Sequence, residues 1–449
     1  MSSTGTGAEF VTRLIEIAIN EGADEAEVYA KMSKNLSIEV KEQKIDTLET
    51  SKTTGYCVRV IKDKRLGFSY STDPGEMEKV VRRALEASGY SEPDDYNGLP
   101  LKSEPSAVTV FDGEVASLSE DEAINRVLAI EASALAEDKR IKKVRKASGS
   151  FSTNRTYIIN SHGINIDYDS TACSAQIMAI AEEGTESQMG WDFEGSRFLK
   201  DVSFESVGRN AARRALNLLG ARKTMPVKGS ILLDNSIIVD FLGILSSALS
   251  SESVQKRKSM LAGKKGELVI SQRLNIIDSG LINGKLGSKP VDDEGVATTY
   301  KILIDKGVLN GFLYNTYTSR KDNVKSTGNA VRGGFTGLPS VGPSNIYIEP
   351  VSKEYTADLS SLIKNMRKGL YVTETMGMHT VNPISGEFSV GASGLWIENG
   401  EIKYSAKEAV ISGDILQLFK NVLMVGDDIR FYGNIGAPSL LIEGIDISG

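Results

Sequence analysis

The sequence of 449 residues predicts an α+β protein built in two parts. The N-terminal domain, residues 1–222, is expected to contain a helix–antiparallel meander–helix unit twice. The C-terminal domain, residues 223–449, is expected to be strand-rich with one buried helix. Two observations lead to this prediction. The first half changes from helical to strand periodicity twice in the same order, and the second half is rich in glycine and in strand patterns. Helices segregated from antiparallel strands define the α+β class.

The first unit is expected to begin with a helix over residues 8–22. Apolar residues recur there at helical spacing, and Gly22 stands where a C-cap glycine belongs. Residues 25–71 then alternate between apolar and polar side chains, which is typical of half-buried antiparallel strands. Pro74 opens the closing helix, residues 77–88, because proline is favoured in the first turn of a helix.

The second unit repeats this order. Ser119 and Glu122 form a capping-box pattern at the start of an amphipathic helix. Strand patterns follow over residues 142–183, and a last helix is expected over 204–219. A proline-containing link, residues 91–105, separates the two units.

The closing helices of the two units share letters. Val-Arg-Arg-Ala-Leu at residues 81–85 matches Ala-Arg-Arg-Ala-Leu at residues 212–216. We interpret the repeated order and the shared letters as an internal duplication. Chance similarity between two amphipathic helices is the alternative.

After a boundary near residues 221–227, a strand leads into the helix that we expect to be buried. Its apolar face consists of Ile238, Phe241, Leu242, Leu245 and Leu249. Strand patterns dominate from there on, with a short helix at residues 415–421. Lys306-Gly307 and Asn399-Gly400 are hairpin turn signals, of which Asn-Gly is the stronger.

Composition excludes several classes of function. The net charge is −7 and basic residues are not clustered, so direct binding to nucleic acid is not expected. No stretch approaches the ~20 apolar residues of a membrane span, and no signal peptide opens the chain, so we expect a cytoplasmic protein. A catalytic zinc ion typically takes three protein ligands, mainly histidine, cysteine and carboxylate side chains, and this chain has two cysteines and two histidines. No metal or other cofactor is therefore expected.

Two groups of acids could carry chemistry. Asp292, Asp293 and Glu294 precede a glycine and could form an acid/base pair or bind a metal. We favour a charged, solvated turn, because adjacent carboxylates on an extended chain point in alternate directions. Asp192 and Glu194 are expected on a loop, where surface acids are favoured over a carboxylate pair.

A glycine-rich segment and a histidine complete the candidates. Residues 327–334 lack the ending and context of a phosphate loop, so we expect a loop whose backbone approaches another chain. His379 lies between two strands and could act as a base near neutral pH. A hydrogen-bonded loop histidine is the favoured reading, because no nucleophile or orienting acid stands at a suitable spacing.

Residues 391–402, Gly-Ala-Ser-Gly-Leu-Trp-Ile-Glu-Asn-Gly-Glu-Ile, closely resemble the signature block of the TldD/PmbA family. Residues 292–295, 327–329 and 425–429 resemble further family motifs, and the likeness runs over essentially the whole chain. The first block resembles the PmbA branch, also called TldE, more than the TldD branch. The family is a zinc-peptidase system that also carries the name modulator of DNA gyrase.

The resemblance implies where a zinc site would stand. The TldD branch binds zinc through His-Glu-x-x-x-His on a helix and a cysteine near the C-terminus. In that register this chain has Leu242 and Ser247 at the histidine positions and Gly243 at the position of the glutamate. No cysteine follows Cys173. The resemblance therefore implies a degenerate zinc site.

A TldE-like chain of this kind would be a non-catalytic subunit paired with a TldD-like catalytic subunit. The resemblance implies cleavage of unfolded or modified peptides by the pair, with roles in maturation of a peptide antibiotic and degradation of an antitoxin. An extended peptide could add to an exposed sheet edge through main-chain hydrogen bonds. Arg332, Gly333, Gly334 and His379 are the expected groove residues.

Two alternatives stay open at this point. The chain could regulate DNA gyrase by binding it, as one family name suggests. It could also be a stand-alone hydrolase that uses His379 or the acids at residues 292–294. A homodimer is possible for the isolated chain.

Overall fold

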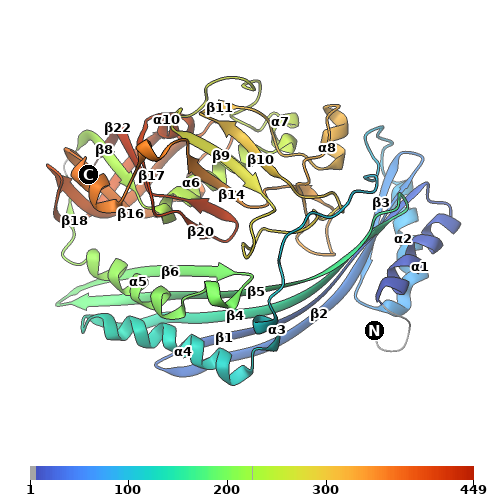
Figure 1. The fold of residues 1–449 in the computed structure, drawn as a ribbon, viewed down its shortest axis with the longest axis horizontal. Helices are drawn as coiled ribbons and strands as arrows, with labels where there is room; N and C mark the ends of the chain where they lie inside the picture. Colours follow the sequence, from blue (N-terminus) through green and yellow to red (C-terminus); the bar gives the residue numbers. More distant parts are fainter. Residues whose placement is uncertain (1–6, 225, 449) are drawn as a thin grey trace.

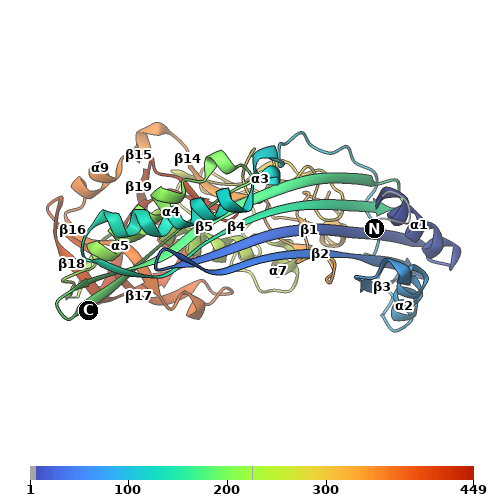
Figure 2. The same cartoon turned by 90° about the horizontal axis from the view of Figure 1, so that it is seen from below.

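The computed structural model describes residues 7–224 and 226–448. A long, curved antiparallel sheet forms one layer, and the C-terminal half of the chain lies over its concave face (Figure 1). Helices cover the opposite face of the sheet, one pair near each end (Figure 2). The mixed α/β architecture confirms the predicted α+β class. No helix among the described residues is both long and apolar enough to cross a membrane.

The sheet has six strands in the order β3-β2-β1-β4-β5-β6, and every neighbouring pair is antiparallel. Its strands are β1 (Glu25–Lys41), β2 (Lys44–Lys62), β3 (Arg65–Ser71), β4 (Ile141–Asn160), β5 (Asn165–Glu183) and β6 (Glu186–Ser196). The helices of this half are α1 (Gly7–Asn20), η1 (Pro74–Glu76), α2 (Met77–Gly89), α3 (Gly113–Ser117), α4 (Glu120–Glu137), η2 (Leu199–Asp201) and α5 (Phe204–Asn217).

The duplication predicted from the sequence is visible in this order. Each unit runs helix, three strands, 3-10 turn, helix, and the first strands of the two units, β1 and β4, pair antiparallel at the centre of the sheet. The capping box of Ser119 and Glu122 is formed. Gly22 has φ +96°, as a helix-ending glycine requires.

The sequence match between the two closing helices does not align the residues that are equivalent in the structure. The two alignments differ by one helical turn. A Cβ on Gly67 of β3 would lie 1.9 Å from the Ala84 carbonyl oxygen, and a Cβ on Gly190 of β6 would lie 2.2 Å from that of Ala211. In each unit the closing helix therefore packs against a strand glycine, which makes Ala84 equivalent to Ala211. The letter match instead aligns Ala84 with Ala215.

One strand of this N-terminal sheet was not predicted. Asp192 and Glu194 lie on β6, at the edge of the sheet, and not on a loop. The alternation of apolar and polar residues is hard to recognise in β6, because both faces of this strand pack against other elements. One face packs on α5, and the other contacts β20 of the C-terminal half.

The C-terminal half contains two main sheets. One has the order β11-β10-β9-β14-β21-β20, and the other has the order β15-β19-β22-β8-β16-β17-β18-β7. Because β22 also pairs with β18, strands β22, β8, β16, β17 and β18 form a closed ring. A short hairpin, β12 and β13, stands apart from both sheets.

The strands of this half are β7 (Arg222–Lys223), β8 (Val227–Leu233), β9 (Leu274–Ser279), β10 (Tyr300–Asp305), β11 (Val308–Leu309), β12 (Ala330–Val331), β13 (Ser340–Val341), β14 (Ile346–Pro350), β15 (Thr356–Ala357), β16 (Lys368–Met376), β17 (Glu387–Glu398), β18 (Glu401–Asp414), β19 (Val422–Gly426), β20 (Arg430–Tyr432), β21 (Ile435–Ala437) and β22 (Leu440–Ser448). Its helices are α6 (Asn235–Ala248), α7 (Ser251–Gln255), α8 (Thr316–Lys321), η3 (Lys353–Tyr355), α9 (Leu359–Lys364), η4 (Met378–Thr380) and α10 (Ile415–Lys420).

Helix α6 is the predicted buried helix. All five residues of its predicted apolar face are buried in the largest core of the protein, which also takes in residues of both sheets. The two predicted hairpin turns are present, with Lys306 and Asn399 at φ 47° and 52°. The division of the chain at residue 222 stays a prediction, and β7 directly after it pairs with β18.

Candidate functional site

Helix α6 carries the residues at which the family resemblance implies a degenerate zinc site. The side chain of Leu242 is fully buried in the core, whereas Ser247 is exposed and its Oγ donates to the Gly243 carbonyl oxygen at 3.3 Å. Positions five residues apart lie about 140° apart around an ideal helix, which agrees with this difference in burial. Gly243 is half-buried, and Ile435 of β21 lies 3.3 Å from where its Cβ would be.

These residues do not fit a zinc ion. Leucine and glycine side chains offer no donor atom, and a serine hydroxyl alone cannot replace the usual three nitrogen, sulfur or carboxylate ligands. Cys57 and Cys173 are both buried in the N-terminal half. Across residues 7–224 and 226–448, no group of three histidine, cysteine or acidic residues is arranged to hold a metal.

The acids at residues 292–294 are buried, so the predicted solvated turn is wrong. Asp292 accepts three backbone hydrogen bonds, from the amides of Glu294, Val296 and Ala330 at 2.9–3.0 Å. Asp293 pairs with Lys289 at 2.7 Å. These acids are 1–2% exposed, because the turn lies where the two halves of the chain meet.

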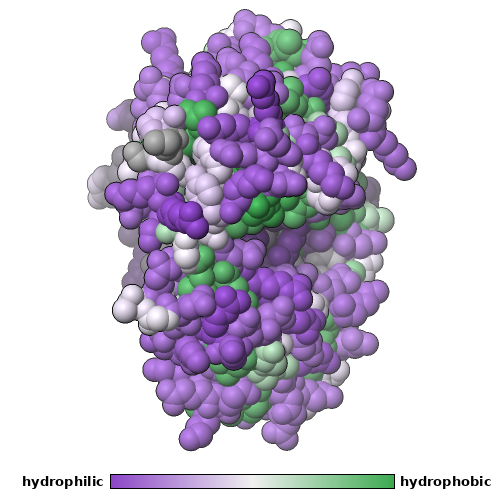
Figure 3. Space-filling model, turned by 90° about the vertical axis from the view of Figure 1, so that its left-hand side faces the viewer, coloured by the Kyte–Doolittle hydropathy of each residue, from purple (hydrophilic) through white to green (hydrophobic). Residues whose placement is uncertain are grey.

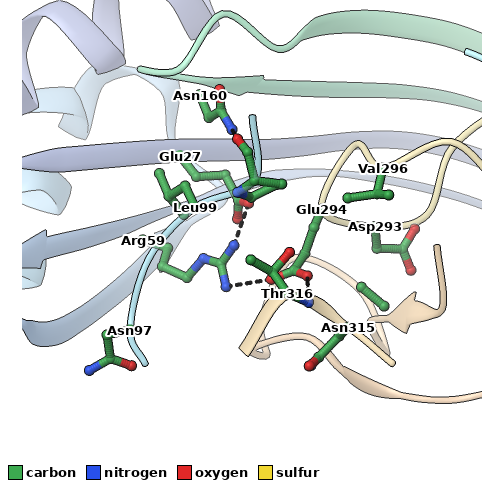
Figure 4. A network of polar contacts seen from close by, with 12 residues as sticks. Glu27, Arg59, Asn97, Leu99, Asn160, Asp293, Glu294, Val296, Asn315 and Thr316 are labelled. Atoms are coloured by element: carbon green, nitrogen blue, oxygen red, sulfur yellow. Dashed lines mark hydrogen bonds and ion pairs between the residues drawn. The ribbon is translucent and has the colours of Figure 1, made fainter. Parts of the chain in front are cut away.

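Glu294 belongs to a buried charge network that joins the two halves (Figure 4). Arg59 of β2 lies between two carboxylates, Glu27 of β1 at 2.6 Å and Glu294 at 2.9 Å. Arg332 pairs with the second oxygen of Glu27, and the Thr316 amide donates to the second oxygen of Glu294 at 2.9 Å. We call Glu27, Arg59, Glu294 and Arg332 the central network.

The pKa values within this region follow from burial and pairing. Burial opposes the charge on Arg59, but Glu27 and Glu294 outweigh that effect and raise its pKa above the usual value. Burial likewise works to raise the pKa of Glu294, yet Arg59 brings it below the usual range. Asp292 has no cationic partner of this kind. Burial, and to a smaller extent the charge of Glu294, raises the pKa of Asp292 to about 7.

Asp192 and Glu194, predicted as surface acids, also differ from expectation. Arg430 of β20 pairs with both carboxylate oxygens of Asp192 at 2.7 and 2.9 Å, and Asp192 is 1% exposed. Glu194 accepts the Ser203 amide at 2.8 Å. Nearby, Arg214 of α5 pairs with Asp234 at the start of α6 at 2.9 Å. A second set of ion pairs thus joins the halves at the far end of the sheet.

The glycine-rich segment, residues 327–334, packs against the N-terminal sheet. Arg332 was expected in a peptide groove, but its side chain is fully buried between Glu27, the Asp293 and Gly337 carbonyl oxygens and the Cys57 thiol. It is therefore not available to a peptide. Gly333 and Gly334 have open space around them, and their part in a groove stays a prediction.

His379 lies on η4 and is exposed. It makes no hydrogen bond or ion pair with any residue that the structure describes, which differs from the hydrogen-bonded loop histidine that the sequence favours. The expected groove residues are thus not brought together, since Arg332 is sealed in the centre and His379 lies at the surface.

A pocket of about 370 Å³ lies beside the central network, between the two halves. Arg59 and Glu294 form part of its wall, and Lys256 and Lys321 stand among its charged residues. Tyr317, Leu338 and Pro339 supply its less polar surface, so the pocket has mixed character.

The upper face of the N-terminal sheet, which is the face turned towards the C-terminal half, changes character along its strands. Odd-numbered residues of β1 face the C-terminal half, and even-numbered residues pack on the helices below. Near the central network this upper face is sealed by Val291 and Phe335. Farther along it consists of small polar side chains that are mostly half-buried, and the molecule is hollowed between its two halves when seen from the end (Figure 3).

We call this surface the polar floor. Neighbouring strands place its residues side by side, and hydrogen bonds link Ser33 to Asn154, Ser150 to Asn35 at 2.8 Å and Gln176 to Ser148 at 2.9 Å. Its members are Ser33, Asn35, Ser37, Ser148, Ser150, Ser152, Asn154, Ser170, Ser174 and Gln176.

The sequence analysis missed both the central network and the polar floor. Glu27 and Arg59 are single charged residues within apolar stretches of strand, and this pattern could have indicated the central network. For the floor, the signal was the series of serine and asparagine residues at alternate positions of β1 and β4. Only the pairing of distant strands shows that the two series lie side by side.

Comparison with known families covers nearly the whole chain. Three models of PmbA/TldA metallopeptidase domains match: domain 1 at residues 26–88, the central domain at 113–219 and the C-terminal domain at 226–449. The boundary between the last two models falls between residues 219 and 226.

Individual relatives agree with these models. The metalloprotease PmbA of Escherichia coli O157:H7 is 30% identical over 98% of this chain and 96% of its own length. A metalloprotease TldD homologue of Haemophilus influenzae is 25% identical over 100% of this chain and 98% of its own. The crystal structure of a Thermotoga maritima protein, named for modulation of DNA gyrase, matches with a TM-score of 0.90 and 30% identity over 99% of this chain and 100% of its own. The chain therefore belongs to the PmbA/TldD metallopeptidase family.

Proposed function

We propose that this chain is the non-catalytic, TldE-like subunit of a cytoplasmic two-subunit metallopeptidase. A TldD-like partner would supply the zinc site, and this chain would help to hold an extended peptide, unfolded or modified, during cleavage. The natural peptide would be the precursor of a peptide antibiotic, which the pair matures, or an antitoxin, which the pair degrades.

The composition of helix α6 carries this proposal. In the register that the family resemblance implies, the zinc-site positions of this helix are occupied by Leu242, Gly243 and Ser247. A general base and a metal-bound water need a carboxylate and metal ligands, and these three side chains provide neither. The 30% identity to a PmbA protein, compared with 25% to a TldD homologue, supports the same branch.

Burial of the acids argues against a stand-alone hydrolase. Asp293 and Glu294 are paired with Lys289 and Arg59, and Asp292 is held by three backbone amides. None of these carboxylates is free to meet a substrate. His379 is accessible but has no orienting acid beside it, so it lacks the partner that a catalytic imidazole needs.

Reconstitution tests the proposal. The purified chain, a TldD-like chain and their mixture are incubated with an unfolded casein-type substrate, and released peptides are counted by mass spectrometry. We expect cleavage only when the TldD-like chain is present, a higher rate for the mixture, and loss of activity with a chelator.

Two results would overturn the proposal. One is chelator-resistant cleavage by this chain alone, which would favour a stand-alone hydrolase. The other is zinc bound in a one-to-one ratio to the isolated chain. Copurification with DNA gyrase and with no His-Glu-x-x-x-His protein would support the regulatory alternative in its place.

A further inference from the structure

A row of three residues marks the border between the sealed and the open part of the sheet's upper face. Lys31, Thr156 and Tyr168 lie directly opposite one another on β1, β4 and β5. On one side of this row the face is covered by the C-terminal half, and on the other side the polar floor begins with Ser33. The row is therefore the inner end of the polar floor.

Positive charge gathers at this end. The half-buried Lys31 makes no hydrogen bond or ion pair with its side chain among the described residues. Lys289 pairs with Asp293 at 2.7 Å and keeps 29% of its side chain exposed. The buried Arg197 donates only to carbonyl oxygens, those of Thr171, Leu286 and Ser288. We call Lys31, Lys289 and Arg197 the cationic corner.

Among the residues that the structure describes, Asp293 is the carboxylate whose charge acts on Lys31. Burial lowers the pKa of Lys31, and the charges of Lys289 and Arg197 lower it further, against the opposite effect of Asp293. Both carboxylates of the neighbouring central network are already paired with arginines. The corner is therefore short of negative charge.

An unmet hydrogen bond points the same way. The Nε of Arg197 is buried and has no partner among the described residues. Buried donors are nearly always satisfied in folded proteins, so an unsatisfied one calls for an explanation, and a bound acceptor is one such explanation. This observation depends on geometry and not on the number of charges. It therefore supports independently that the cationic corner lacks negative charge.

The polar floor can accept a chain that leads to this corner. A strand rises about 3.3 Å per residue, so the floor from Lys31 to Ser37 is about 20 Å long and matches about six residues of an extended peptide. Its small hydroxyl and amide side chains leave room and offer hydrogen bonds without selecting side chains. At this end of the molecule a hollow lies between the two halves (Figure 3).

We propose that the cationic corner binds the terminal carboxylate of an extended peptide whose preceding residues lie on the polar floor. This inference rests on the proposed function, because it takes the substrate of the complex to be a peptide. Lys31 provides the free ammonium for an ion pair, and the floor positions the chain. The subunit then recognises a free C-terminus and not a sequence.

The test compares two forms of one probe. A fluorescein-labelled peptide of about eight glycine, serine and alanine residues is made with a free C-terminal acid and with a C-terminal amide. Binding to the full chain is followed by fluorescence anisotropy, alone and with a TldD-like partner. We expect the acid to bind about tenfold more tightly, because a charge-assisted hydrogen bond is lost in the amide.

Variants assign the effect to the corner. Lys31→Met is expected to remove the difference between acid and amide, and Lys31→Arg to keep most of it. Lys34→Met is the matched control, since Lys34 lies on the same strand but on the opposite face. Urea unfolding curves of all three variants show whether each one folds. Excess inorganic phosphate tests whether any free anion competes as well as a peptide acid.

Equal binding of acid and amide would overturn this inference and leave the proposed function intact if reconstitution succeeds. Absence of binding by either form, with and without the partner, would overturn it as well. Phosphate competition at the strength of the peptide acid would assign the corner to free anions and not to peptide termini. Failure of reconstitution alone would count against the subunit role and not against carboxylate binding.

Discussion

The upper face of the N-terminal sheet has two regions with the same backbone and opposite surfaces. Around Tyr29, Cys57 and Ile158 it is apolar and sealed by Phe335 of the C-terminal half. A few residues along the same strands, around Asn35 and Ser150, it is polar and open. The comparison shows that strand pairing provides the platform and that side-chain size and polarity decide whether the other half can close on it.

The sealed region also holds the central network, and this location explains how charges are tolerated there. Each carboxylate oxygen of Glu27 meets an arginine, and Glu294 is shared between Arg59 and the Thr316 amide. Buried charges are costly when a partner is missing. The sealed region should therefore be sensitive to substitution, and the open region should tolerate it.

Arg59→Met is expected to have the largest effect. It removes the cation between Glu27 and Glu294 and leaves two buried carboxylates with less compensation, which should cost about 3–5 kcal/mol in the free energy of unfolding. Urea unfolding measures this loss. Arg155→Met is the control, because its pairs with Asp167 and Asp169 are well exposed and should be worth less than about 1 kcal/mol. Equal losses in both variants would contradict the comparison.

Gly55→Ala should have the next largest effect. A Cβ on Gly55 would lie 2.2 Å from the Phe335 ring, so the ring must move and the seal must loosen. We expect a loss of about 1–3 kcal/mol, as for an overpacked core, together with faster proteolysis of the segment around Phe335. Gly333→Ala, where no atom lies within 4 Å, should change stability little. An unchanged free energy of unfolding in Gly55→Ala would mean that Phe335 packs only loosely on the sheet, against this prediction.

Asp292 should give the sealed region a pH dependence. Its pKa is raised to about 7 in the folded protein, so the folded state binds this proton more tightly than the unfolded state. The stability that it contributes is present below about pH 4 and is lost as pH rises through about 7.

In Asp292→Asn the free energy of unfolding should fall less steeply between pH 4 and 7, as measured by urea unfolding across that range. The slope is the readout, because the absolute stability should fall at every pH. If the asparagine oxygen keeps the Glu294 and Val296 amides, its Nδ2 group faces the Ala330 amide and cannot accept from it. Asp46→Asn, at an exposed position, is the control. An unchanged slope in the Asp292 variant would contradict the prediction.

Ser150→Tyr should have the smallest effect on stability and a selective effect on function. The substitution removes the hydrogen bond from Ser150 to Asn35, so we expect a loss of about 1 kcal/mol or less in unfolding free energy. In the reconstituted complex, peptide cleavage should fall several-fold because the ring fills the path above the polar floor. Thr153→Tyr, on the opposite face of β4, should leave cleavage unchanged. Equal cleavage by the two variants would argue against a peptide on the floor.

Local patterns gave most of the secondary structure. Helix α1, the capping box at Ser119, the buried helix α6 and the hairpin turns at Lys306 and Asn399 all follow from periodicity and turn chemistry. Strand β6 was missed, because a strand with both faces in use does not show simple alternation. The order of the two units was predicted correctly, but the letter match chose a register one turn away from the true one.

The amino-acid sequence by itself determined the fold class, the duplication and the lack of zinc ligands at Leu242, Gly243 and Ser247, because periodicity and donor chemistry are properties of neighbouring residues. Only the tertiary structure decided that Asp292 and Asp192 are buried, that Arg332 is sealed in the centre, and that serines from distant strands form one floor. Burial and charge compensation depend on which surfaces meet, and those contacts join residues more than 200 positions apart.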